Sequence, residues 1–262
     1  MYQTLTIEEI KDSQNFKDNF FWNRIFFKGI ISSSPISDFL YFENSNYSRE
    51  SKTLKEHGNF YNMLINELPS WQNLPLRNNS IIFTNDFSVA RAFAIPRPSE
   101  GKEFAKLFAV IPKKGSKLVV SSESDLWYSF SPFFRSIGIN KYTYTLTDFN
   151  ATLKDLASYF DEQDFDMSLE NFNQLILEIK NRKVDTCKMS LHTKIIYDGI
   201  VDSSVDFLDL LDKNFSPEFN NFHCVNIEDS TVIKSNRELW TNEECILVNF
   251  DKFNDLAALL SI

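Results

Sequence analysis

Apolar residues recur along this chain at spacings of three and four, which is the period of an amphipathic helix. The clearest stripes cover residues 149–160 and 172–179, and acidic side chains lie on the other faces of both segments. These charges, and the pair Asp164 and Asp166, are interpreted as a solvated surface. Further helices are predicted over residues 6–20, 59–68, 87–94, 207–211 and 253–260.

Short runs of β-branched and aromatic residues, bounded by Gly, Pro or polar clusters, predict strands. Residues 32–51 are rich in Ser, Asn and Asp and predict loop or short turns. Strands near both ends, with helices before and between them, indicate the α+β class rather than a regularly alternating α/β chain. The predicted strands cover residues 24–30, 80–84, 107–111, 117–120, 222–227, 231–233 and 245–250.

Composition and charge narrow the class of protein. The 262 residues carry a formal net charge of −9, so a nucleic-acid partner would need a local basic patch. The 26 phenylalanines indicate either a core of aromatic blocks or a composition bias. Three cysteines without a C-x-x-C pair favour reduced thiols. The polar N-terminus and the absence of an apolar run near ~18 residues lead us to expect a cytoplasmic protein without a membrane partner, although leaderless delivery into another cell stays open.

Several common catalytic motifs are absent from the sequence. There is no G-x-G-x-x-G turn, no phosphate-binding P-loop, no H-E-x-x-H and no G-x-S-x-G elbow. The three histidines are scattered and form no Cys/His cluster for zinc, so we expect no metal. A Ser/His/Asp triad forms only in space and stays open. An NAD⁺-binding protein with this sequence would lack the Rossmann turn.

Three separated segments resemble the ordered signature of the mono-ADP-ribosyltransferase superfamily. The first is Phe27-Lys-Gly-Ile30, the second is Arg77–Asp86 followed by Ala90 and Phe93, and the third is Arg237-Glu-Leu-Trp240. That signature is a basic residue with Gly on an early strand, a Ser/Thr strand followed by Ala and an aromatic residue, and a late catalytic Glu. The resemblance covers about residues 24–130 and 222–250.

Further landmarks resemble the phage and bacterial branch of this superfamily, in which an Arg-rich segment and Pro-x-Trp precede the Ser/Thr strand. A Val-x-Pro turn and an Asp-x-Trp follow that strand in this branch. The matching residues here are Arg49, Ser51, 59–62, Pro69-Ser-Trp71, Pro75, Arg77, Val110-Ile-Pro112, Asp125-Leu-Trp127, Ser129 and Phe130.

The resemblance implies a fold and an activity. It implies one domain over residues 1–262, built as a split β-sandwich of two packed sheets around an NAD⁺ cleft. A helical insert at about 140–215 matches no known pattern. NAD⁺ is the expected co-substrate, and the acceptor is macromolecular, either a protein side chain or nucleic acid. Relatives with this signature often act as toxins, effectors or phage-defence components, so an inhibitory antitoxin-type partner is also expected.

The resemblance also assigns roles to individual residues. Cleavage of the nicotinamide–ribose bond builds oxocarbenium-like charge on the ribose, which a carboxylate stabilises. Glu238 has this role, oriented by Thr84 of the Ser/Thr strand. Lys28 holds the NAD⁺ phosphates or the adenosine ribose. The other residues assigned to the cofactor site are Gly29, Arg49, Arg77, Ser80, Asn85 and Phe93, and Asn236 is assigned to acceptor positioning.

Two positions depart from the family pattern. Asn236 stands where many members carry an acid or Gln, which argues against an arginine side chain as the acceptor. Lys28 replaces the usual Arg or His and offers a point charge without a planar fork. A catalytically inactive binding module with the same fold is therefore the alternative.

The same residues also have ordinary structural interpretations. Lys28 is then a solvated strand lysine, Thr84 a β-former and Glu238 a charged turn residue. An unrelated α+β binding protein, the third possibility, predicts that these three residues do not converge.

Overall fold

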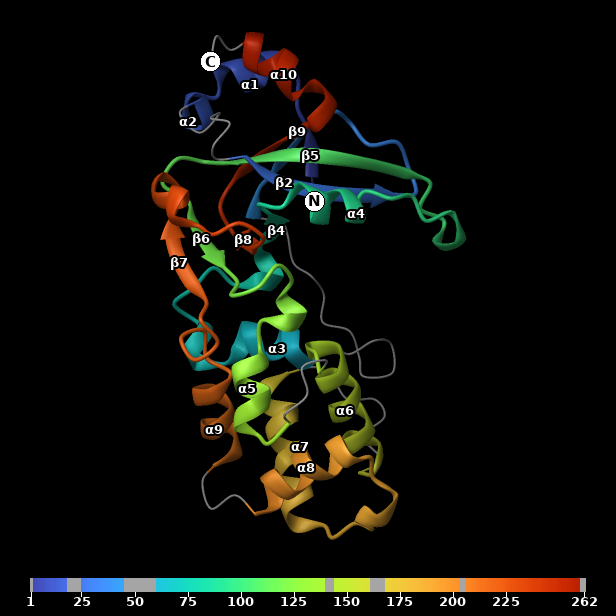
Figure 1. The fold of residues 1–262 in the computed structure, drawn as a ribbon. Helices are drawn as coiled ribbons and strands as arrows, with labels where there is room; N and C mark the ends of the chain where they lie inside the picture. Colours follow the sequence, from blue (N-terminus) through green and yellow to red (C-terminus); the bar gives the residue numbers. More distant parts are fainter. Residues whose placement is uncertain are drawn as a thin grey trace. The chain divides into compact units, whose positions relative to one another are not determined.

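The computed structural model describes residues 2–17, 25–44, 60–139, 144–160, 168–202 and 206–259. They form two compact units (Figure 1). The sheet unit comprises Met1–Ser48, Asn79–Ser124 and His223–Ile262, and the helical unit comprises Arg49–Asn78 and Asp125–Phe222. The predicted insert at 140–215 falls within the helical unit. This unit also includes Arg49–Asn78, which precedes the Ser/Thr strand, and the residues that flank the insert within Asp125–Phe222. The class is α+β, as predicted.

The sheet unit contains a nine-stranded antiparallel sheet in the order β1-β3-β9-β5-β2-β4-β8-β6-β7. The strands are β1 (Tyr2–Thr4), β2 (Phe26–Ser32), β3 (Phe39–Phe42), β4 (Ile81–Thr84), β5 (Phe104–Pro112), β6 (Lys117–Val120), β7 (His223–Asn226), β8 (Glu238–Thr241) and β9 (Cys245–Asn249). Its helices are α1 (Ile7–Asp12), α2 (Gln14–Lys17), α4 (Phe87–Phe93) and α10 (Phe250–Leu259).

Strands β2 and β4 pair over a much shorter length than β2 and β5 do, and this short pairing is called the joint of the sheet. Strand β2 is in register with β5 along its whole length, but with β4 only at Phe27 and Thr84. In Figure 1, β2 and β5 run across the view whereas β6 and β7 are steeply inclined. The sheet therefore changes direction at this joint and is divided into two halves.

One hydrophobic core spans both halves of the sheet. Phe108 and Leu247 contribute from one half, and Phe83 and Leu239 contribute from the other. All buried members of this cluster except Ile227 come from strands. The two halves of the sheet therefore bury this face by packing against each other. On the opposite face of β5 and β9, a second cluster is closed by helices α1 and α10.

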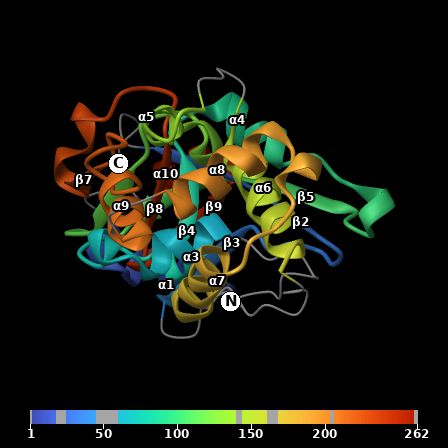
Figure 2. The same ribbon diagram turned by 90° about the horizontal axis from the view of Figure 1, so that it is seen from below.

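The helical unit has an aromatic core. Its α-helices are α3 (Phe60–Glu67), α5 (Ser131–Ser136), α6 (Leu146–Ser158), α7 (Leu169–Asn181), α8 (Leu191–Val201) and α9 (Phe207–Asn214). Helix α8 packs against α6 and α7 (Figure 2). The rings of Phe130 and Phe215 stack with centroids 4.1 Å apart, and Phe133 meets Phe215 edge-on. Trp71 Nε1 donates to the Phe215 carbonyl over 3.1 Å, so this tryptophan packs in the core and also fixes the end of α9.

Short 3₁₀ helices complete the described part of the chain. They are η3 (Pro69–Trp71), η4 (Arg77–Asn79), η5 (Pro98–Glu100), η6 (Leu126–Tyr128), η7 (Thr186–Lys188) and η8 (Ile227–Val232).

Some predicted elements were wrong. The polar segment 32–51 contains β3, because its four apolar residues complete the sheet between β1 and β9. The predicted strand 231–233 is instead the end of η8 and the residue after it. Ile227 N donates to Ser116 O, and Glu228 then accepts from Gly115 N, which turns the chain away from the sheet. The helix predicted over 6–20 breaks at Ser13, which caps α1.

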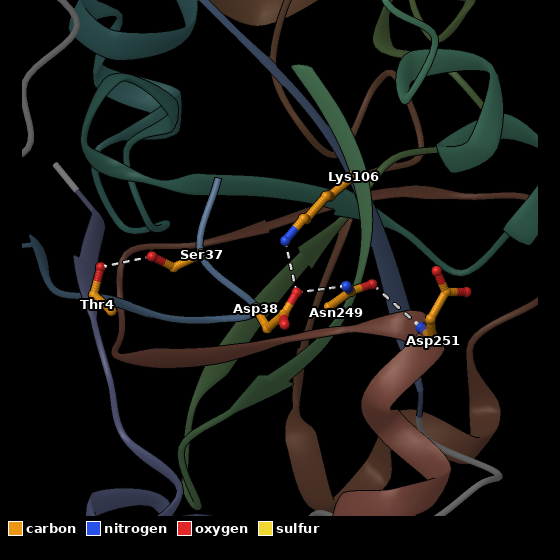
Figure 3. Close-up of polar contacts among 6 residues, drawn as sticks. All are labelled: Thr4, Ser37, Asp38, Lys106, Asn249 and Asp251. Carbon is orange, nitrogen blue, oxygen red and sulfur yellow. Dashed lines mark hydrogen bonds and ion pairs between the residues drawn. The ribbon is translucent and has the colours of Figure 1, made fainter. Parts of the chain in front are cut away.

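A polar network ties the start of β3 to β5 and β9 (Figure 3). Lys106 Nζ lies 2.6 Å from Asp38 Oδ1, and Asn249 Nδ2 donates to the same oxygen over 2.7 Å. Asn249 Oδ1 in turn accepts from Asp251 N at the start of α10. The hydrogen bond from Lys106, and then that from Asn249, lowers the pKa of Asp38.

This pKa shift predicts a pH-dependent contribution to stability. A lowered native pKa means that the Asp38 carboxylate stabilises the fold above its unfolded pKa of about 3.9, and that the contribution disappears as the pH falls through the native pKa. Asp38→Asn is expected to lower the urea midpoint at pH 7, with the difference from wild type shrinking below about pH 4. The exposed Asp12→Asn serves as the control. A difference for Asp38→Asn that is constant from pH 7 to pH 3 would contradict the assignment.

Candidate functional site

A row of side chains crosses four neighbouring strands. Glu238, the first residue of β8, lies opposite Thr84 on β4, and Thr84 lies opposite Phe27 on β2. Ser121 follows β6, and its N–H donates to Glu238 O over 2.9 Å, continuing the β6–β8 ladder by one residue. Directly opposed residues project from the same face of a sheet. The row therefore runs Phe27, Thr84, Glu238, Ser121, with Glu238 half-buried.

Side chains at the end of β4 hold the turn before Glu238 by hydrogen bonds. Thr84 Oγ1 donates to Arg237 O over 2.9 Å. The Asn85 side chain accepts from Arg237 N over 2.7 Å and donates to Lys234 O over 2.7 Å. One amide thus bridges both ends of the turn. Asn236, within that turn, is exposed and has a φ of 57°, a left-handed conformation that Asn tolerates better than most residues. Asn85 therefore has a structural role at the position predicted to bind the cofactor.

Ser121 supports Glu238 from the other side and was not recognised in the sequence. Its Oγ accepts from Glu238 N over 3.1 Å and donates to the carbonyl of Glu123. Glu238 N also lies 3.2 Å from Glu123 O. Ser121 is 1% exposed. The only signal in the sequence was its position directly after a predicted strand, which does not reveal the register.

Lys28 belongs to the opposite face of β2 from Phe27, because side chains alternate along a strand. Its Nζ donates to the carbonyl of Ile82 on β4 over 2.6 Å. Burial raises the pKa of the Cys245 thiol, and the charges of Glu243 and Glu244 raise it further, whereas the Lys28 charge opposes the shift. Lys28 thus bridges the joint between β2 and β4 from the side opposite the row.

Gly29 lets α4 lie directly on β2. A Cβ at this position would come within 2.4 Å of Ala90 O and 2.6 Å of both Phe93 C and Ala94 N. The predicted association of an early Gly with a later Ala and aromatic residue is therefore a packing relation between strand and helix. The Phe93 side chain itself is 52% exposed.

Aromatic rings lie beside the Phe27 end of the row. Phe27, Phe87 and Phe250 contact one another in pairs, with centroids 5.1 to 5.7 Å apart. Phe87 is partly exposed at the start of α4. The row therefore ends against a partly exposed apolar surface.

The remaining residues that the sequence assigned to the cofactor site are Ser80, Arg77 and Arg49. Ser80 is fully buried and precedes Thr84 by four residues, roughly 13 Å along an extended strand. Arg77 belongs to the helical unit, where its guanidinium is buried and donates to Asn62 Oδ1 over 3.1 Å. This contact gives Arg77 a structural role, and its predicted phosphate contact stays a prediction. Arg49 lies outside the described residues.

Within the ranges that the structure describes, no group of three His, Cys, Asp or Glu side chains is arranged to hold a metal ion. Among the helices of those same ranges, none has the length and apolar character needed to cross a bilayer.

Comparison with known proteins finds no matching family model, no match among curated proteins and no match among solved structures.

The packing of α4 on β2 predicts the effect of a substitution at Gly29. Gly29→Ala forces the helix backbone to move, and overpacking of this kind costs about 1–3 kcal/mol of unfolding free energy. Chemical denaturation measures the loss. Gly199→Ala is the matched control, because a Cβ at that position in α8 meets nothing within 4 Å and the change favours a helix by about 0.5–1 kcal/mol. Equal effects of the two substitutions would contradict the packing argument.

Proposed function

We propose that this chain is a mono-ADP-ribosyltransferase, which cleaves NAD⁺ and transfers ADP-ribose to a macromolecular acceptor. The observation that carries the proposal is the adjacency of β2, β4 and β8. These strands bear Lys28, Thr84 and Glu238, which are widely separated in the sequence. The three strands are adjacent, with Thr84 and Glu238 on one face and Lys28 spanning the joint from the other, and an unrelated binding protein has no reason to bring these strands together.

The environment of Glu238 suits the proposed chemistry. Loss of nicotinamide builds positive charge on the ribose, and a fixed carboxylate stabilises that charge without reorganising during the reaction. Glu238 begins a strand whose backbone is bonded to β4 on one side and to the end of β6 on the other. In the proposed complex its carboxylate bonds the 2′-hydroxyl of the ribose, as the family resemblance implies.

The proposed NAD⁺ and acceptor contacts involve Lys28, which lies on the other face of the sheet from this carboxylate, and Asn236 in the turn before it. Lys28 offers a positive charge to the phosphates or the adenosine ribose. Exposed Asn236 precedes Glu238 by two residues, and its amide can hydrogen-bond an acceptor without supplying a charge. The acceptor is a protein side chain or nucleic acid, and a role as toxin, effector or phage-defence component is proposed from resemblance alone.

The fold proposed with this function is the split β-sandwich of the superfamily. Two observations support it: the single register pair between β2 and β4, and the core that both halves of the sheet share. The proposed NAD⁺ site lies near this joint, where three of the predicted residues are carried by adjacent strands.

A catalytically inactive binding module of the same fold is the second candidate. The hydrogen bond from Lys28 Nζ to Ile82 O favours it, because this bond uses part of the amine's donor capacity inside the sheet. The bonds of Thr84 and Asn85 to the turn before Glu238 have the same implication, since they engage those side chains with protein backbone.

Substitution of Glu238 tests the proposal. Wild-type protein, incubated with labelled NAD⁺ and a whole-cell extract, is expected to release nicotinamide and label a macromolecule. Glu238→Gln is expected to lower both by about 100-fold or more, because the fixed charge opposite the ribose is lost. The exposed Glu103→Gln, in the same unit, is the charge-matched control and is expected to match wild type. Digestion with protease or nuclease then identifies the acceptor class.

Two outcomes would overturn parts of this proposal. Undiminished nicotinamide release by folded Glu238→Gln would remove the glutamate from the mechanism. No turnover by wild type, together with no NAD⁺ binding in a calorimetric titration, would exclude the enzyme and favour the binding module.

A further inference from the structure

The peptide group that joins Arg237 to Glu238 is held by two side-chain hydroxyls. Its C=O belongs to Arg237 and accepts from Thr84 Oγ1 over 2.9 Å. Its N–H belongs to Glu238 and donates to Ser121 Oγ over 3.1 Å. The six atoms of a peptide unit are nearly coplanar, so contacts at both of its polar ends fix the orientation of the whole plane. The following peptide is held as well, because Glu238 O accepts from Ser121 N, so the two peptide groups together set the direction in which the Glu238 side chain leaves the strand.

The Ser121 hydroxyl takes the place of a missing ladder acceptor. The registered pairs of β6 and β8 end at Val120 and Leu239, and the bond from Ser121 N to Glu238 O continues the ladder by one residue. As β6 ends, Glu238 N–H is shared between Ser121 Oγ and the carbonyl of Glu123.

The orientation of this hydroxyl is also determined. Ser121 Oγ donates its proton to the Glu123 carbonyl, which leaves a lone pair for Glu238 N–H. Because Ser121 is buried, water does not compete for these bonds, and in such surroundings a satisfied polar network makes the local structure rigid.

We propose that Ser121 is a positioning residue for Glu238 and acts with Thr84 to fix the peptide group before it. This inference rests on the proposed function, in which Glu238 must meet the ribose at a defined distance. Displacement of a reacting group by about 1 Å can cost roughly 100-fold in rate. Ser121 touches neither substrate nor reacting atoms in this proposal and acts only through Glu238.

Ser121→Ala is the primary test, with Ser116→Ala as the matched control. Both serines are buried and lie at opposite ends of β6, but only Ser121 bonds Glu238. Ser121→Ala is expected to lower kcat for nicotinamide release by about tenfold or more with KM for NAD⁺ changed less than about twofold. It is also expected to speed hydrogen exchange of the Glu238 amide. Ser116→Ala is expected to change neither quantity.

A second variant covers the case in which the alanine protein does not fold. Ser121→Cys keeps the shape of the side chain but offers a much weaker acceptor. It is therefore expected to lower kcat as well, but by less than Ser121→Ala does. Wild-type kcat in folded Ser121→Ala or Ser121→Cys would overturn the inference while leaving the proposed function intact. Absence of turnover by wild type would overturn the proposed function and, with it, the catalytic meaning of Ser121. Unchanged exchange of the Glu238 amide in the variants would overturn the hydrogen-bond assignment independently of activity.

Discussion

Strands β4 and β8 meet in a register that pairs Thr84 with Glu238 and Phe83 with Leu239. The second pair is buried in the core shared by the two halves of the sheet, so the first pair must project from the other face. A slip of one residue would exchange these faces and bury a carboxylate in that core, at a cost of several kcal/mol unless the group were neutralised. Hydrophobic burial on one face thus fixes where the candidate catalytic group emerges on the other.

The joint between β2 and β4 has a comparable influence on the surroundings of the site. Only one pair of residues is in register there, and Lys28 spans the joint to Ile82 O from the inner side. On the outer side, Gly29 admits the backbone of α4 so closely that no side chain fits between them. The single register pair with β4, a cation and a helix contact therefore fall on three consecutive residues of β2, namely Phe27, Lys28 and Gly29.

The polar side chains around Glu238 mostly bond backbone groups. Thr84, Asn85 and Ser121 together hold the turn before Glu238 and the peptide group that leads into it. In the proposed reaction, stabilisation of the developing charge would therefore depend on one well-supported carboxylate. It also explains why residues that resemble a ligand-binding motif in the sequence have structural roles in the fold.

The sequence by itself determined the local features of this protein. Helical periodicity located most α-helices, runs of β-branched and aromatic residues located β2, β4, β6 and β9, and the order of short motifs singled out Lys28, Thr84 and Glu238. Such patterns depend on residues only a few positions apart, so they can be recognised in the sequence. Local patterns did not predict β3, because Phe39–Phe42 lies in a polar segment. They did not predict β8 either, because its residues were interpreted only as the segment before a later strand.

Tertiary structure alone decided the register. Thr84 and Arg237 are 153 positions apart, and Ser121 reaches Glu238 across 117. Those contacts arise because burial of one sheet face selects a single pairing of distant strands, and no local pattern carries that choice.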